Sequence, residues 1–135
     1  MNDIEKLIEK NTSKYKNGSL KKALGNALQG CLYAFFSQRN FIIHFIVSIV
    51  VLLLALWLKV SFERFLFLLL VILFCLTIEI ANTVIEKTVD LITDEWNPKA
   101  KLVKDLAAGM MLMVSIGSLI IGFLILLPPL LAKFL

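Results

Sequence analysis

The sequence is poor in the residues that build the commonest soluble active sites. It has one histidine, two cysteines and three prolines in 135 residues. The spacing of His44, Cys31 and Cys75 excludes a zinc motif, and no Ser/His/Asp nucleophile set is present. We expect both cysteines to be inert thiols in apolar surroundings. No glycine-rich phosphate loop occurs, so any handling of ATP must rely on side chains carried by helices.

Charged residues are also scarce, at 18% of the chain, whereas hydrophobic residues make up 59% and the mean hydropathy is +0.88. This balance is typical of an integral membrane protein. Apolar runs at residues 41–58, 65–85 and 106–131 are each long enough to cross about 30 Å of hydrocarbon. We therefore expect an all-α, three-span membrane domain at residues 41–131, which forms in effect one domain with residues 1–40.

The formal net charge of +4 follows the membrane and does not indicate nucleic acid binding. All but three of the fourteen lysines and arginines precede the first span or lie between the second and third. The exceptions are Lys59, Arg64 and Lys133. The positive-inside rule therefore places the N-terminus in the cytoplasm and the C-terminus outside.

Residues 1–40 are expected to form a cytoplasmic or interfacial amphipathic region. No continuous apolar stretch typical of a cleavable signal peptide occurs there, so the first span is expected to act as its own insertion signal. From Leu20 to Phe35, apolar residues recur at helical spacing with lysines at the polar margin, which predicts a helix lying in the membrane interface and capped by Ser19. A short amphipathic piece at residues 1–10 precedes it, and the sequence Ser-Gln-Arg-Asn at 37–40 interrupts the pattern.

Four polar residues at the end of the second span fall on one narrow helical stripe: Glu79, Asn82, Glu86 and Asp90. Ionisable groups at membrane depth are costly and point to function. The deeper Glu79 is suited to act as a base, and the shallower Glu86 is suited to bind a hard cation. With Lys104 at the start of the third span, these are the groups that handle a nucleoside triphosphate.

Each of these residues also has a structural reading. Glu79 and Asn82 can join helices by hydrogen bonds, Glu86 and Asp90 can form a solvated face, and Lys104 can anchor the topology. His44 is expected to reach towards the interface. Pro128 and Pro129 are expected to disturb the far end of the third span.

The same residues resemble the signature of the prokaryotic diacylglycerol kinase family, and they are most similar to the undecaprenol kinases of Gram-positive bacteria. The resemblance covers about residues 19–127, and its most specific parts are EIANTVIEKTVD at 79–90, DEWNP at 94–98 and AKLVKDLAAG at 100–109. It implies a homotrimer in the bacterial cell membrane that transfers the γ-phosphate of MgATP to a lipid hydroxyl. Undecaprenol is the expected acceptor, with diacylglycerol as the other choice, and no nucleic acid partner is expected.

The resemblance also implies roles for individual residues. Glu79 matches the catalytic base, and Glu86 matches a ligand of the Mg²⁺ that accompanies ATP, with Gln38 at a second metal-binding position. Lipid-binding positions are Glu79, Trp57 and Ala108. The positions that contact ATP are Asn82, Glu86, Asp90, Glu95, Asn97, Lys104 and Asp105.

The chain departs from the family pattern in its N-terminal half. Gln38 replaces a metal-binding glutamate, and a neutral amide binds Mg²⁺ more weakly than a carboxylate. Further departures are Ile42 for a basic residue, Gly25 and Asn26 for a Lys-Tyr pair, and Ser19 for an arginine. Two interpretations remain open, a working kinase with a looser metal site or a non-catalytic scaffold or lipid-binding subunit. The complete C-terminal set favours the kinase.

Overall fold

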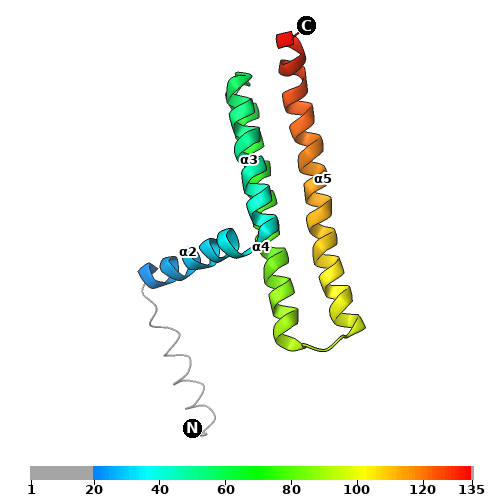
Figure 1. Cartoon of the computed structure of the whole chain (residues 1–135). Coiled ribbons are helices and arrows are strands. Elements are labelled where there is room, and N and C mark those ends of the chain that lie inside the picture. Colours follow the sequence, from blue (N-terminus) through cyan, green and yellow to red (C-terminus); the bar gives the residue numbers. More distant parts are fainter. Residues whose placement is uncertain (1–19, 135) are drawn as a thin grey trace, which may run out of the picture. The chain divides into compact units, whose positions relative to one another are not determined.

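The chain folds as four helices in the computed structural model, which describes residues 20–134. They are α2 (Leu20–Ser37), α3 (Arg39–Trp57), α4 (Phe62–Ile92) and α5 (Pro98–Phe134), as Figure 1 shows. No strand occurs among residues 20–134, which confirms the all-α class. The amphipathic piece predicted at residues 1–10 and the cap at Ser19 lie outside the described residues. Residues 20–33 belong to a compact unit distinct from the bundle formed from residue 34 onward, and the interfacial placement of α2 stays a prediction.

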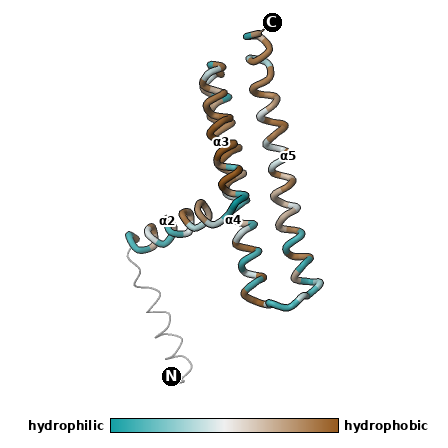
Figure 2. Tube along the Cα trace, viewed as in Figure 1, coloured by the Kyte–Doolittle hydropathy of each residue, from teal (hydrophilic) through white to brown (hydrophobic). Residues whose placement is uncertain are grey.

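Three of these helices, α3, α4 and α5, are long and apolar enough to cross a membrane by length and composition. They contain the runs predicted at residues 41–58, 65–85 and 106–131, apart from the single residue after α3. The 31 residues of α4 and the 37 residues of α5 extend about 46 Å and about 55 Å. Both exceed the roughly 30 Å of a bilayer core. Figure 2 shows hydrophilic residues gathered where the two helices meet their connecting loop, so these ends project beyond the hydrocarbon.

The bundle is organised around α4, which packs along both α5 and α3, whereas α3 and α5 scarcely meet. Near the turn between α3 and α4, Ala55, Leu58, Leu68 and Leu126 form a buried apolar cluster. The Lys133 ammonium lies 3.6 Å from the centroid of the Trp57 ring and donates to the Trp57 carbonyl oxygen at 3.3 Å. We call this end of the bundle, with its apolar cluster and its Lys133–Trp57 contact, the closed end.

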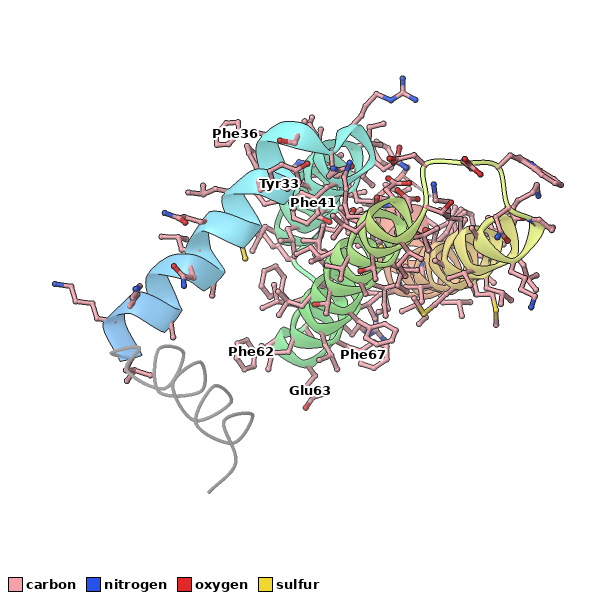
Figure 3. The ribbon with its side chains drawn as sticks, turned by 90° about the horizontal axis from the view of Figure 1, so that it is seen from below. Tyr33, Phe36, Phe41, Phe62, Glu63 and Phe67 are labelled. Atoms are coloured by element: carbon pink, nitrogen blue, oxygen red, sulfur yellow. The ribbon has the colours of Figure 1, made fainter. Side chains whose placement is uncertain are left out.

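The turn between α3 and α4 is a tight helix-ending motif. The backbone N–H of Val60 donates to the Ala55 carbonyl at 3.2 Å, and that of Lys59 donates to the Leu56 carbonyl at 3.0 Å. Lys59 adopts the left-handed conformation, with φ of 52°, a position that usually carries glycine. The next helix starts at once, and Figure 3 shows Phe62, Glu63 and Phe67 extending from its first turns.

The junction between α2 and α3 is a single residue, Gln38, in an extended conformation. Aromatic rings gather beside it: the Phe35 ring meets the rings of Phe41 and Phe45 edge-on, at centroid distances of 6.5 Å and 5.1 Å. The interruption predicted at residues 37–40 is therefore confirmed, and it is shorter than the sequence indicates.

Pro128 and Pro129 do not end the third span, because α5 continues through both residues to Phe134. Each proline removes one backbone donor from the helix. Membrane-spanning helices tolerate this loss when neighbouring groups satisfy the released carbonyls. The third span therefore reaches the closed end as one continuous helix.

Candidate active site

The polar stripe on α4 runs from the interior of the bundle towards the loop at residues 93–97, which joins α4 to α5. We call this end of the bundle the aqueous end. Glu79 and Asn82 are 2% and 5% exposed, and Thr83 beside them is also buried. Glu86 is half-buried and Asp90 is exposed. One helical face thus carries two carboxylates in different surroundings, the inner one shielded from water and the outer one open to it.

The buried part of the stripe holds acceptors that lack a donor. The Asn82 side-chain nitrogen donates to Glu86 Oε1 at 3.1 Å, which fixes the orientation of the amide. Its Oδ1 atom and the Oε2 atom of Glu79 are buried with no hydrogen-bond partner within the described chain. A buried unpaired acceptor costs about 1–3 kcal/mol. The two atoms lie one helical turn apart and are suited to receive a donor from a bound molecule.

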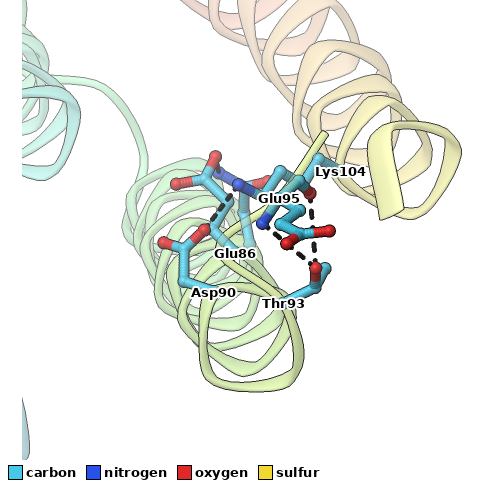
Figure 4. Close-up of polar contacts among 6 residues, drawn as sticks. Glu86, Asp90, Thr93, Glu95 and Lys104 are labelled. Carbon is cyan, nitrogen blue, oxygen red and sulfur yellow. Dashed lines mark hydrogen bonds and ion pairs between the residues drawn. The ribbon is translucent and has the colours of Figure 1, made fainter. Parts of the chain in front are cut away.

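The outer part of the stripe faces the start of α5. Lys104 Nζ donates to Asp90 Oδ1 at 2.5 Å, which joins the two helices at the aqueous end (Figure 4). This hydrogen bond, together with the positive charge of Lys104, lowers the pKa of the Asp90 carboxyl, which lies beyond the apolar run at 65–85. Both side chains stay about half exposed, so a phosphate can compete for the lysine.

The loop between α4 and α5 is held by its own short contacts. Thr93 Oγ1 accepts a bond from the backbone N–H of Glu95. The Asn97 side-chain oxygen accepts from the backbone N–H groups of Lys99 and Ala100 at 2.9 Å and 3.3 Å. Asn97 therefore caps α5, with proline at the first helical position. The loop, which follows the stripe's outer end along the chain, presents Glu95 and Asn97 as exposed residues.

The structure brings together some of the predicted site residues. Asn82 contacts Glu86, and Asp90 contacts Lys104. Asp105 pairs with Lys101 on the exposed surface of α5. Ala108 is exposed on the same helix, close to the loop.

Other predicted residues lie elsewhere. Trp57 is at the closed end, where it contacts Lys133, about 25 Å along α4 from Glu79. Ile42 is half-buried on α3, and Gly25 and Asn26 are exposed on the first half of α2. Gly25 and Asn26 belong to the separate unit that includes residues 20–33.

Among residues 20–134, the protein ligands for a magnesium ion are the least complete part of the predicted site. Across residues 20–134, no three His, Cys, Asp or Glu side chains gather as a ligand set. Glu86 still fits the task, because Asn82 engages only its Oε1 atom and Mg²⁺ is commonly bound by one or two carboxylates together with substrate phosphates. Gln38 is half-buried, and its side chain makes no capping hydrogen bond to α3.

Sequence reasoning missed the contact that His44 makes with α4. A cavity of about 560 Å³ lies between α3, α4 and α5, and His44 lines it with Ser48, Cys75, Ser115 and Ser118 among apolar side chains. The His44 ring points at α4, with Nδ1 3.8 Å from Cys75 Sγ, and its expected reach towards the interface stays a prediction. The spacing of His44 and Ser48, one helical turn apart, was the available signal.

Comparison with known proteins gives consistent results. The sequence profile described as prokaryotic diacylglycerol kinase matches residues 25–126. An undecaprenol kinase of Bacillus subtilis is 40% identical over 94 residues, covering 70% of this chain and 76% of the relative. A diacylglycerol kinase of Synechocystis is 37% identical over 107 residues, covering 78% of this chain and 61% of the relative. The matched profile includes the whole stripe, the loop, Lys104 and Gln38.

Proposed function

The chain belongs to the prokaryotic diacylglycerol kinase family of lipid kinases, and we propose that it transfers the γ-phosphate of MgATP to the hydroxyl of undecaprenol. The observation that carries this proposal is the buried Glu79, whose Oε2 lacks a partner and whose helical face leads through Asn82 and Glu86 to the aqueous end. Undecaprenol is preferred to diacylglycerol because the Bacillus subtilis relative is named an undecaprenol kinase.

In the proposed reaction, Glu79 takes the proton of the lipid hydroxyl. The hydroxyl oxygen then bonds to the γ-phosphorus as the bond from that phosphorus to the leaving oxygen of ADP breaks. The stripe suits this meeting of two phases, because Glu79 is shielded inside the bundle whereas Asp90, three turns further on, is open to water. Positioning and charge neutralisation supply most of the rate in phosphoryl transfer.

The nucleotide side of the site lies at the aqueous end. Glu86, held by Asn82, would bind the Mg²⁺ of MgATP, which neutralises charge on the transferred group. Lys104 would bind a phosphate group of the nucleotide and release Asp90, with which it pairs in the free protein. Glu95, Asn97 and Asp105 are exposed and accessible to the rest of the nucleotide, with Asn97 contributing its amide nitrogen since its oxygen caps α5.

The proposed lipid-binding residues lie at different levels along the bundle. In this proposal Ala108, an exposed residue of α5, contacts the acceptor close to its hydroxyl, and Trp57, at the closed end, contacts the distal part of a long chain. The charge distribution supports a cytoplasmic N-terminus and an active site at the cytoplasmic face of the bacterial cell membrane. The homotrimer implied by the family resemblance completes the proposal.

The test is phosphoryl transfer by purified protein in detergent, using ATP labelled on its γ-phosphate with undecaprenol or diacylglycerol. We expect label in undecaprenol, and loss of transfer in Glu79→Gln. The matched control is Glu63→Gln, the same change at an exposed position on the other end of α4, which should keep full activity. Absence of label in every lipid would reject the kinase.

A non-catalytic scaffold or lipid-binding subunit is the second candidate, and the neutral Gln38 is the observation that favours it. The scaffold predicts that Glu79→Gln changes oligomer stability and that no phosphoryl transfer exists to be lost. Limited proteolysis of the loop at residues 93–97 separates the two candidates, because only a nucleotide-binding protein is protected there by MgATP.

A further inference from the structure

Another cavity, of about 390 Å³, lies between the start of α4 and the far part of α5. Its lining combines two charged residues with four apolar ones: Glu63, Arg64, Phe67, Ile121, Leu124 and Ile125. It is open at the surface, since Phe67 is 49% exposed and Leu124 is 68% exposed. Ile125 also packs against the buried apolar cluster, so we call this cavity the closed-end groove. Glu63 lies about 24 Å along α4 from Glu79, which separates the groove from the proposed active site.

The charged residues of the closed-end groove lie at one end of it. Glu63 and Arg64 belong to the first turn of α4, ahead of the apolar run at 65–85, and both are exposed. Figure 3 shows Glu63 and Phe67, one helical turn apart, extending on the same side of α4. The four apolar lining residues lie within the runs at 65–85 and 106–131. The groove therefore has a charged mouth at the level of the membrane–water interface and an apolar body at the level of the hydrocarbon.

The chain does not neutralise the two charges at this mouth. The ion pairs found among residues 20–134 join Lys101 to Asp105 and Lys104 to Asp90, and both lie at the aqueous end. Consecutive residues of a helix do not face one another, so Glu63 and Arg64 are poorly placed to pair. Their Cα atoms are only about 3.8 Å apart. The mouth thus offers one negative and one positive group to the same ligand.

A phospholipid whose headgroup carries a primary ammonium has the complementary groups. Its phosphodiester is an anion that a guanidinium binds through two parallel N–H bonds, and its ammonium can donate to a carboxylate. Phosphatidylglycerol would satisfy Arg64 alone, because it brings no cation for Glu63. Apolar contacts do not select among bilayer lipids, since the surrounding acyl chains are equally apolar. The charges of the headgroup therefore decide which lipid occupies the groove.

We propose that the closed-end groove binds phosphatidylethanolamine. The phosphate lies on Arg64, the ammonium on Glu63, and one acyl chain runs along Phe67 and Leu124. The lipid fills the space between α4 and α5 and is not chemically changed. This inference does not depend on the proposed lipid kinase function, because no residue of the stripe takes part in the binding.

Native mass spectrometry of the detergent-purified protein tests the headgroup preference. With equal amounts of phosphatidylethanolamine and phosphatidylglycerol of the same acyl chains, the wild type should retain the first about tenfold more strongly, the effect of one charge-assisted hydrogen bond. Glu63→Gln should bring this ratio to about one, and Arg64→Gln should weaken the retention of both lipids. The matched controls are Asp94→Asn and Arg39→Gln at exposed positions outside the groove, which should keep the wild-type ratio. A wild-type ratio of about one, or an unchanged ratio in Glu63→Gln, would overturn the proposal.

Leu124→Trp separates a lipid from a second copy of the chain as the occupant. The larger ring fills the groove, so this variant should retain less phosphatidylethanolamine and keep its oligomeric mass. A changed oligomeric mass with wild-type lipid retention would assign the groove to a contact between copies and overturn the proposal. A further measurement needs no variant: the melting temperature of the wild type should rise more with phosphatidylethanolamine than with phosphatidylglycerol. Equal shifts with the two lipids would contradict a specific site.

Discussion

The two ends of the bundle satisfy their buried groups to different degrees. At the closed end, Leu68 is 2% exposed among other apolar side chains, and the Lys133 ammonium lies over the Trp57 ring and bonds a carbonyl. On the stripe that leads to the aqueous end, Glu79 is equally buried, yet its Oε2 atom has no partner in the described chain. Burial alone therefore does not separate a structural residue from a functional one.

The difference lies in what the buried groups still lack. Leu68 is stabilised by van der Waals packing against neighbours within the chain, which needs no polar partner. Glu79 and Asn82 leave acceptors that a bound hydroxyl or nucleotide complex can satisfy. We expect substitutions at the closed end to change stability and substitutions at the aqueous end to change catalysis.

The largest expected effect is on turnover in Glu79→Gln. Replacing the proposed base should lower kcat by about 10²–10⁴-fold, while the melting temperature stays equal or rises because a buried charge is removed. Activity and thermal unfolding are measured on the same detergent preparation. A destabilised variant that keeps its turnover would show that Glu79 serves packing, and the contrast between the two ends would fail.

The opposite pattern is expected for Leu68→Ala. Truncating this buried leucine should lower the free energy of unfolding by about 2–5 kcal/mol, measured by denaturation in mixed micelles, with near-normal kcat per folded molecule. Leu70→Ala on the same helix is the matched control, because Leu70 is 62% exposed and its truncation should cost far less. Equal losses in the two variants would contradict a specific core at the closed end.

A smaller effect sharpens the description of the aqueous end. Gln38→Glu should add a charged ligand beside the nucleotide metal and lower the Mg²⁺ concentration for half-maximal activity by about fivefold. Gln29→Glu, at an exposed position of α2, adds the same charge and should change little. If the magnesium titration of Gln38→Glu overlays that of the wild type, residue 38 is not at the metal.

The smallest expected effect concerns the turn that leads into the closed end. Lys59→Gly should raise the free energy of unfolding by up to about 1 kcal/mol, since glycine adopts φ of 52° without steric strain. Lys59→Ala keeps the steric conflict and should bring no gain. Kinase activity should be unaffected by either change, and a loss of activity in Lys59→Gly would show that the turn acts on the aqueous end.

The sequence predicted much of this arrangement, because both the spans and the stripe depend on local periodicity. The spacing of residues 79, 82, 86 and 90 indicates one face on any helix, and the depth of each residue follows from its distance to the apolar run. The structure agrees, with burial falling steadily from Glu79 to Asp90.

Contacts between helices were not predictable in the same way. The rotation of α3 decides whether His44 faces Cys75 or lipid, and no feature of a single sequence fixes that rotation. Lys133 and Trp57 meet only because two distant helices end at the same level. The residue roles at the active site remain proposals, because they depend on bound molecules as well as on the fold.

The central place of α4 has a consequence for the order of assembly. Since α3 and α5 each pack on α4 and scarcely on one another, the hairpin of α3 and α4 can form while the ribosome is still making the third span. Lys104 and the loop of residues 93–97 join the stripe only when α5 has been inserted and docked. We expect a chain arrested before α5 to form the hairpin of α3 and α4 but not to bind ATP. Activity would then require the insertion of α5.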